Sequence, residues 1–416
     1  MGVLFSCFNF AGRKFLDFMI DGISVRVQSL APSATLAMSQ QSAELKAQGA
    51  DVINLSVGEP DFFTPHHIKQ AAREAIDGNF SFYSPVAGYL SLREAIVEKF
   101  RKENNLDFTP DHIVVGNGAK HELCNVVMAV VNPGDEVIVP APAWVSYMQM
   151  VALVGGKNVE ISTTMEHDFK MTAAQLEAAI TPRTRMLILC SPSNPTGSVY
   201  SKQELGDLAQ VLARHPHVLV LSDEIYEHIN YVGGHESIAQ FPELHDRVVI
   251  VNGVSKAYAM TGWRIGYVAA PLWLAKAVST LQGQYTSGAS SIAQKAAEAA
   301  YRGPQECVEE MRMAFQRRRN VVVDLMRAIP GVKLTVPDGA FYVFPSFKAF
   351  LGKKAGNVVI KDAGDLALYL LNEAHVATVS GDSFACPGHI RVSYATGDQN
   401  LTSACSRIGQ ALARLS

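Results

Sequence analysis

The segment GVSKAYAMTGWRIG (253–266) contains Lys256, whose amine could react with a carbonyl compound. Eight positions later it contains Arg264, whose guanidinium could bind an anion. The run RVVIVN (247–252) before it is apolar and rich in β-branched residues, which predicts a buried strand just ahead of Ser255 and the lysine. Burial disfavours an ammonium group and lowers its pKa, and a neutral lysine amine forms Schiff bases. Arg264 offers a planar guanidinium for a phosphate, and Ser255 adds a hydroxyl donor. A surface Ser–Lys turn before an ordinary strand is the alternative interpretation.

Two further predicted strands end in polar groups. The apolar run 185–190 is followed by SPSNPTG, which contains Asn194, and the run 218–221 is followed by SDEIY, which contains Asp223 and Tyr226. Ligands of α/β sheets bind beyond the carboxyl ends of the strands, so we expect these side chains near the lysine. A buried carboxylate is costly unless it is paired, so Asp223 predicts a cationic partner. Each motif also has a structural interpretation, as a turn before a helix or as a helix start.

A glycine-containing turn between a strand and a helix predicts an anion site. The strand HIVV (112–115) leads into GNGAK (116–120), and helical sequence follows from His121. The free backbone N–H groups at a helix N-terminus bind phosphate readily. A dinucleotide-binding fold is the rival interpretation, but the third glycine of its fingerprint falls on His121, and no acidic residue ends the next strand.

The order of Asn194, Asp223, Tyr226, Lys256 and Arg264 resembles that of the class I aminotransferases of fold type I, in the bacterial subgroup similar to aspartate aminotransferase. The resemblance spans nearly the whole chain. It implies that Lys256 holds pyridoxal 5'-phosphate (PLP) covalently and that Arg264 binds its phosphate. Asp223 would keep the pyridine nitrogen protonated, which makes the cofactor an electron sink. Asn194 and Tyr226 would hydrogen-bond the phenolate oxygen of the ring.

Other positions acquire cofactor roles through the same resemblance. Trp144 follows the predicted strand 136–139 and would cover the pyridine ring, although a core aromatic at a helix start is its simpler interpretation. Tyr83 would reach the phosphate of the neighbouring subunit, which implies a homodimer with shared sites; local packing in a loop is the alternative. The remaining contacts around the cofactor would come from Gly118, Ala119, Lys120 and Ser255.

Arg391 is the one arginine in the apolar strand IRVSY (390–394), where it needs an anion. A buried structural ion pair would satisfy it, but the resemblance implies that it binds the α-carboxylate of the substrate. In the subgroup, a lysine at the position of Lys120 is associated with the distal carboxylate of aspartate or glutamate. The resemblance places further residues at the substrate: Gly58, Thr35, Trp144 and Asn194.

The implied reaction is a ping-pong transfer of the amino group between aspartate or glutamate and a 2-oxo acid such as 2-oxoglutarate, through pyridoxamine phosphate. Lys256 would move the substrate proton as base and acid. Two positions depart from relatives: the basic residue associated with prephenate is Ala31 here, and Gly253 replaces a phosphate-binding hydroxyl. Alternatives on the same fold are an aromatic or prephenate aminotransferase and a PLP-dependent C–S lyase. The alternative without PLP is a nucleotide-binding oxidoreductase. A non-catalytic regulator with an aminotransferase-like domain would need an appended DNA-binding module, and none is visible in the sequence.

The composition is that of an ordinary globular protein, with 416 residues of which 48% are hydrophobic and 18% charged. A net charge of −3 provides no basic field for nucleic acid. No apolar run reaches the roughly 18 residues needed to cross a bilayer, and the six cysteines lack metal-ligand spacing. We therefore expect a cytoplasmic protein with no metal site, no nucleic-acid partner and no membrane anchor. Residues 1–18 are expected to be a disordered tail, although MGVLFS loosely fits a myristoylation pattern.

The helix and strand pattern predicts an α/β fold, in which a large domain with a mostly parallel sheet wrapped by helices is joined by a smaller α+β domain. The expected divisions are an N-terminal segment (19–62) that joins the small domain, a large PLP-binding domain (63–305) and a small C-terminal domain (306–416). Residues 272–309 are expected to be helical with a break at 284–288, and the charge run 317–319 to be a solvated helix face. Other expected elements are helices 33–48, 65–78, 91–103, 311–329 and 363–374 and strands 52–57, 332–336, 339–344, 376–379 and 389–394.

Overall fold

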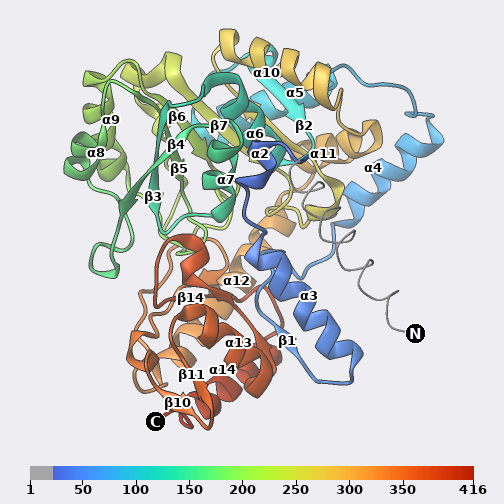
Figure 1. The fold of residues 1–416 in the computed structure, drawn as a ribbon. Coiled ribbons are helices and arrows are strands. Elements are labelled where there is room, and N and C mark those ends of the chain that lie inside the picture. The colour runs from blue at the N-terminus through green and yellow to red at the C-terminus, as the bar shows by residue number, and fades with distance from the viewer. Residues whose placement is uncertain (1–21) are drawn as a thin grey trace, which may run out of the picture.

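The computed structural model describes residues 22–416. A seven-stranded sheet in the order β2-β8-β7-β6-β5-β3-β4 forms the larger of two units (Figure 1). All neighbours pair in parallel except β8, which is antiparallel to both β2 and β7. The strands are β2 (Ile113–Gly116), β3 (Glu136–Ala141), β4 (Lys157–Ser162), β5 (Thr184–Cys190), β6 (Leu219–Asp223), β7 (Val248–Gly253) and β8 (Gly266–Ala269).

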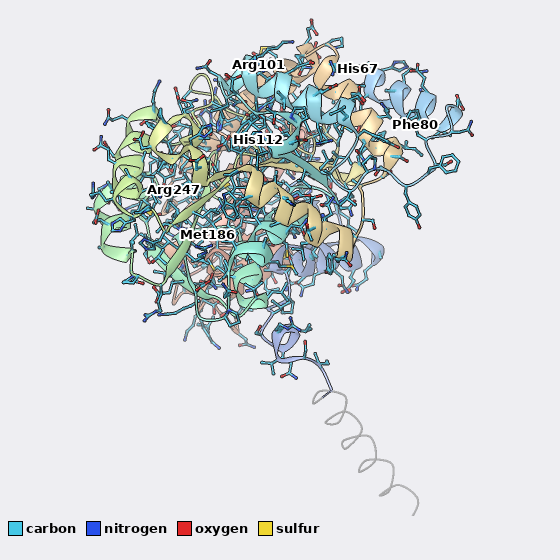
Figure 2. The ribbon with its side chains drawn as sticks, turned by 90° about the horizontal axis from the view of Figure 1, so that it is seen from above. His67, Phe80, Arg101, His112, Met186 and Arg247 are labelled. Atoms are coloured by element: carbon cyan, nitrogen blue, oxygen red, sulfur yellow. The ribbon has the colours of Figure 1, made fainter. Side chains whose placement is uncertain are left out.

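The central strands are continuous apolar runs because helices cover both faces of the sheet (Figure 1). Successive side chains point to opposite faces, so Val220 belongs to one hydrophobic core and Leu221 to the other. Met186 of β5 lies among the strands in the middle of the molecule, whereas Arg101 lies near its rim (Figure 2). The strands whose ends carry the predicted polar groups therefore belong to one sheet, and these ends lie at one edge of it.

Local sequence explains where several helices of this unit begin and end. Pro65 precedes and Gly78 follows α4, and the side chains of Ser201 and Glu204 cap α9 reciprocally. The turn 116–120 is shorter than expected, since its helix already begins at Ala119. The helices are α4 (His66–Asp77), α5 (Leu90–Lys99), α6 (Ala119–Val130), α7 (Val145–Leu153), α8 (Ala173–Ala179), α9 (Lys202–Arg214), α10 (Leu272–Tyr285) and α11 (Ser291–Arg302).

A smaller unit is built from both ends of the described chain (Figure 1). Strand β1 (Ile53–Asn54), near the N-terminus, pairs in parallel with β12 (Val376–Ala377). A three-stranded antiparallel sheet lies beside them in the order β13-β14-β9. The remaining elements are β9 (Tyr342–Val343), β10 (Lys354–Ala355), β11 (Val358–Val359), β13 (Val379–Ser380), β14 (Ile390–Ser393), α2 (Val25–Gln28), α3 (Ala34–Ala47), α12 (Glu306–Arg327), α13 (Ala363–Ala374) and α14 (Asp398–Leu412). The predicted α/β class with a smaller α+β part is confirmed.

Several predicted boundaries are wrong. The helical stretch 272–309 has a second break at Gly303 and Pro304, so α12 begins at Glu306 and not at residue 311. Proline lacks a backbone N–H and fits the start of a helix better than its interior. Only two residues of the predicted strand 52–57 form β1, and the region 332–344 is irregular apart from β9 and isolated bridges. The predicted strand 376–379 is divided between β12 and β13.

The charge run on α12 is not simply a solvated face. Arg318 is 7% exposed and makes two hydrogen bonds to the Asp61 carboxylate, at 2.6 and 3.0 Å. Its guanidinium carbon also lies 5.1 Å from the centre of the Phe62 ring and 5.7 Å from that of Phe315. Arg318 therefore ties α12 to the segment after β1, while Arg317 is largely exposed.

In the described part of the chain, no helix is both long and apolar enough to cross a membrane. The expectations for residues 1–18 lie outside the described residues.

Candidate active site

A pocket of about 510 Å³ opens at the carboxyl ends of the sheet strands, between the two units. Residues from the ends of the neighbouring strands β5, β6 and β7 meet there with residues of α3 and β14. The predicted site residues that line it are Thr35, Gly58, Ala119, Lys120, Trp144, Asn194, Asp223, Tyr226, Ser255, Lys256, Arg264 and Arg391.

Lys256 lies on the floor of this pocket and is partly buried. Its Nζ donates a hydrogen bond of 2.6 Å to the carbonyl oxygen of Gly58. Burial lowers the pKa of Lys256 to about 8, and Arg391 and Arg264 contribute in the same direction while Glu59 opposes them. The amine therefore loses its proton more readily than an exposed lysine, which suits a nucleophile and a base.

Asp223, at the end of β6, is 3% exposed. Its Oδ2 accepts a 2.6 Å hydrogen bond from the hydroxyl of Tyr147, and its Oδ1 accepts one of 3.2 Å from the backbone N–H of Ile225. Burial raises the pKa of Asp223 to about 6, although the Tyr147 hydrogen bond acts in the opposite direction. The carboxylate faces the pocket and can pair with a cation bound there.

Tyr226 and Asn194 also project into the pocket and are nearly buried. The hydroxyls of Tyr226 and Tyr342 lie 2.8 Å apart. Asn194 accepts a hydrogen bond of 3.0 Å at Oδ1 from Nη1 of Arg391. These groups can bind oxygen atoms of a ligand between them.

The guanidinium of Arg264 lies against the N-terminus of α6, where it donates hydrogen bonds to the carbonyl oxygens of Thr261 at 3.0 Å and Asn117 at 3.2 Å. Gly118 has φ +88°, and a Cβ on it would come 2.4 Å from Nη2 of Arg264, so only glycine fits this turn. Within the described residues, the side-chain hydroxyl of Ser255 makes no hydrogen bond. Backbone donors at the helix start, a guanidinium and a free hydroxyl together can bind a phosphate.

Arg391 on β14 is 2% exposed, and burial lowers its pKa. Besides the bond to Asn194, its Nη2 donates to the Ser56 carbonyl at 2.5 Å, while its Nε has no partner within residues 22–416. Its guanidinium carbon lies 4.6 Å from the centre of the Tyr342 ring. No carboxylate of the described chain pairs with Arg391, so the buried ion pair considered from the sequence is not formed. A buried guanidinium in this state can bind a carboxylate from outside.

The outer wall of the pocket carries Lys120, Trp144 and Thr35. Nζ of Lys120 lies 4.7 Å from the centre of the Trp144 ring. Lys120 is exposed, so its ammonium group can turn toward a second anionic group of a ligand.

Two predicted residues do not line the pocket of the single chain. Gly118 is the N-cap of α6, next in sequence to the lining residue Ala119. The side chain of Tyr83 is 99% exposed and does not line the pocket. Its predicted role in a neighbouring subunit stays a prediction.

Sequence reasoning missed Tyr147, Tyr342 and Glu59, which also line the pocket. Tyr147 stands three positions after Trp144, a spacing that places two helical side chains on one face and could have indicated it. Tyr342 is brought in only by the pairing of β9 with β14, where Ser393 lies opposite it. A Cβ on Gly58 would meet the Tyr342 hydroxyl at 2.3 Å, so the glycine is required by this packing.

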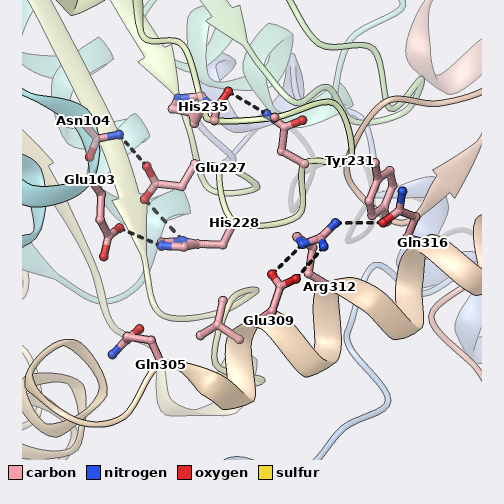
Figure 3. Close-up of a pocket in the computed structure, with 14 residues that line it drawn as sticks. Glu103, Asn104, Glu227, His228, Tyr231, His235, Gln305, Glu309, Arg312 and Gln316 are labelled. Atoms are coloured by element: carbon pink, nitrogen blue, oxygen red, sulfur yellow. Dashed lines mark hydrogen bonds and ion pairs between the residues drawn. The ribbon is translucent and has the colours of Figure 1, made fainter.

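A larger cavity of about 770 Å³ lies behind the segment that follows β6 (Figure 3). His228 lies between Glu103 and Glu227 in it, and Arg312 binds Glu309 (Figure 3). Among the described residues, two groups of glutamates and histidine come close enough to hold a metal: Glu103, Glu227 and His228, and Glu224, Glu227 and His235. Lys99 already pairs with the shared Glu227, and the absence of a metal site stays a prediction.

The buried pair of His235 and Glu224 predicts a pH-dependent stability. Their Nε2 and Oε2 lie 3.0 Å apart, and the histidine side chain is 6% exposed. Burial alone would lower the pKa of His235, but Glu224 and Glu227 raise it above its usual value of 6.5. The protonated histidine therefore stabilises the fold below pH 6.5, and this contribution is lost as the pH rises through the raised pKa of the folded state.

We expect His235→Gln to lower the free energy of unfolding by about 3 kcal/mol at pH 6. The difference from the unsubstituted protein should shrink at alkaline pH, as measured by urea denaturation over a pH series. His245→Gln is the matched control because the ring of His245 is 69% exposed. A difference between His235→Gln and the unsubstituted protein that does not change with pH would contradict the argument.

The model of the family "Aminotransferase class I and II" matches residues 50–408 of this chain. A probable aspartate/prephenate aminotransferase of Rhizobium leguminosarum bv. phaseoli is 49% identical over 397 residues, covering 94% of this chain and 98% of the relative. An aspartate aminotransferase of Geobacillus stearothermophilus is 46% identical over 93% of this chain and 98% of its own length.

Solved structures agree with these sequence relatives. The aspartate aminotransferase of Rhizobium meliloti superposes with a TM-score of 0.92 and 46% identity over 95% of this chain and 99% of the other. That of Thermus thermophilus, solved with maleate, gives a TM-score of 0.88 and 43% identity over 94% of this chain and 99% of the other. The resemblance inferred from the sequence motifs is confirmed, and this chain belongs to the class I and II aminotransferase family.

Proposed function

We propose that this aminotransferase is a PLP-dependent aspartate transaminase, which moves the amino group between aspartate or glutamate and a 2-oxo acid such as 2-oxoglutarate. One observation carries the proposal: a lysine with a lowered pKa, a buried aspartate and a buried arginine without a carboxylate partner face the same pocket. The first two suit a cofactor and the third suits the carboxylate of a substrate.

The residues of the pocket fit the polar groups of PLP. Lys256 would hold the aldehyde, and Asp223 would pair with the protonated ring nitrogen. The backbone at Gly118 and Ala119 and the guanidinium of Arg264 would hold the phosphate, and a side chain at position 118 would collide with that guanidinium. Bound PLP supplies an electron sink that stabilises negative charge on the α-carbon of an amino acid.

The side chains of the protein then have separate tasks. The Lys256 amine takes the proton from the α-carbon of the amino acid and later returns it, acting as base and acid. Asp223 keeps the proton on the ring nitrogen, and Asn194 and Tyr226 bind the ring oxygen. Arg391 holds the α-carboxylate, which fixes the amino acid so that its α-hydrogen faces the lysine.

An acidic substrate is favoured by Lys120 at the outer wall and by the relatives. The relatives described above carry aspartate in their names, and the Thermus thermophilus structure was solved with maleate, a dicarboxylate. An ammonium group near the pocket mouth can pair with the second carboxylate of such a ligand.

We expect Lys120→Met to lower kcat/KM for aspartate by about 10-fold, which corresponds to one charge-assisted hydrogen bond. The activity with alanine should change little because alanine has no distal carboxylate. Initial rates with both amino acids measure the effect. An equal loss for both substrates, or no loss for aspartate, would show that Lys120 does not recognise the distal carboxylate.

Prephenate is the second candidate substrate, because the relatives from Rhizobium leguminosarum and Cereibacter sphaeroides are named as aspartate/prephenate aminotransferases. Ala31 stands where such enzymes often have a basic residue, and its backbone N–H is bonded to Gln149 in this structure. Rates measured with prephenate and 2-oxoglutarate as competing amino acceptors show which of these two acceptors the enzyme prefers.

The active form is a homodimer in this proposal, with Tyr83 reaching the site of its partner. Support comes from large apolar side chains that the single chain exposes, including Phe63 at 90%, Phe82 at 81% and Tyr83 at 99%. A monomer in sedimentation equilibrium would contradict the shared site.

We also propose a division into a large domain (63–305) and a small domain formed by residues 306–416 with the N-terminal segment.

The absorbance spectrum of the purified protein tests the function, before and after addition of aspartate without an oxo acid. We expect the band of protein-bound PLP to fall and that of pyridoxamine phosphate to grow. If only aromatic or neutral amino acids produce this change, the cofactor assignment stands and aspartate is wrong. If the protein never acquires the band when PLP is supplied, the proposed function is wrong.

A further inference from the structure

Tyr147 is the one side chain that donates a hydrogen bond to the carboxylate of Asp223 in the described part of the chain. It lies on α7, is 2% exposed, and has its ring edge-on to Trp144 with 5.3 Å between the centres. The distance of 2.6 Å from its hydroxyl to Oδ2 is that of a strong hydrogen bond to a charged acceptor.

The other surroundings of Asp223 act on its pKa in both directions. Cys190, its neighbour across the β5–β6 pairing, is a neutral thiol whose pKa burial raises to about 12. The backbone N–H of Ile225 binds the opposite oxygen, Oδ1, and lowers the pKa of Asp223. Glu224 raises this pKa by repulsion, whereas the charge of Lys256 lowers it.

We propose that Tyr147 is a positioning residue that orients the Asp223 carboxylate and keeps it ionised to receive the protonated ring nitrogen of the cofactor. The tyrosine does not need to touch the cofactor for this task. Its hydroxyl anchors Oδ2 and so fixes the rotation of the carboxylate about its side-chain bonds. The inference rests on the proposed function, because it needs a ligand with a protonated nitrogen at this position.

Loss of the hydroxyl would leave a buried carboxylate with one backbone donor. Its pKa would rise further, so a larger fraction of Asp223 would be protonated at neutral pH and could not pair with a cation. We expect Tyr147→Phe to weaken PLP binding to the cofactor-free protein by about 10- to 100-fold at pH 7. In a plot of PLP affinity against pH, the fall in affinity on the acid side (the acid limb) should also move to higher pH.

The matched control is Tyr200→Phe. Tyr200 is 4% exposed, and its hydroxyl accepts a hydrogen bond of 2.7 Å from the backbone N–H of Met171, not from a group that contacts Asp223. This substitution removes another buried hydroxyl and should leave PLP affinity unchanged. Thermal unfolding of both variants shows whether each is folded.

A double-mutant cycle with Asp223→Asn isolates the coupling between the two residues. In the Asp223→Asn background, Tyr147→Phe should no longer change PLP affinity. A second variant, with 3-fluorotyrosine at position 147, keeps the ring and makes the hydroxyl a stronger donor. It should shift the acid limb to lower pH.

Equal PLP affinities for Tyr147→Phe and Tyr200→Phe would overturn this inference and leave the proposed function intact. So would an equal loss in the Asp223→Asn background, or an acid limb that 3-fluorotyrosine does not move. Failure of the unsubstituted protein to bind PLP would overturn the proposed function and this inference together.

Discussion

Replacement of Lys256 by alanine should abolish transamination, with a loss of at least about 10⁴-fold in kcat. In the proposed mechanism, the variant lacks both the amine that attaches the cofactor and the base that moves the substrate proton. Lys256 lies partly buried in the pocket, and burial lowers its pKa to about 8, which makes the amine available for both tasks. Single-turnover kinetics with aspartate measure the loss.

The fold should survive this substitution, because the lysine makes one hydrogen bond, to Gly58. Removal of a partly buried ammonium group also removes the cost of its desolvation. Lys276→Ala, on the exposed face of α10, is the matched control and should retain full activity. Residual activity within about 10-fold of the unsubstituted protein would assign the proton transfer to another group.

Replacement of Arg391 by lysine should lower kcat/KM for both the amino acid and the oxo acid by about 30-fold to several thousand-fold, as expected for 2–5 kcal/mol lost at a buried charged contact. Lysine keeps the charge but cannot form the planar two-point contact with a carboxylate. Both substrates carry the same α-carboxylate, so both half-reactions should slow by similar factors.

Two comparisons separate recognition from folding. An amine without the α-carboxylate should react at the same slow rate with Arg391→Lys and with the unsubstituted protein. Arg247→Lys is the control for the substitution itself, because within residues 22–416 Arg247 donates only to backbone carbonyls, those of residues 212, 215 and 218. If Arg391→Lys affects the amine as much as the amino acid, Arg391 supports the fold and not the substrate.

Arg391 should also lower the stability of the unliganded protein. Its guanidinium is buried, its Nε has no partner, and no carboxylate of the described residues pairs with it. Arg391→Met fills a similar volume without the charge, so it should raise the thermal midpoint of the unliganded protein while removing activity. The buried charge that we propose for substrate binding should therefore destabilise the empty site.

The sequence alone determined the family of this protein and the candidate residues of its site. The residues Asn194, Asp223, Tyr226, Lys256 and Arg264 follow strands or turns that are recognisable from local patterns. Parallel strands bring their carboxyl ends to one edge, so an ordered list of such ends predicts a shared site. The central strands were predictable because a sheet covered on both faces needs continuous apolar runs.

Tertiary structure alone decided the interactions that join distant segments. The break before α12 and the short strands of the smaller unit depend on packing, because a two-residue strand such as β1 carries no periodic pattern. Arg318 looks solvated in its charge run, yet Asp61 and two aromatic rings bury it. The hydrogen bond from Tyr147 to Asp223 joins residues 76 positions apart. Local sequence specifies which groups are available, whereas long-range pairing of strands and helices decides which of them meet.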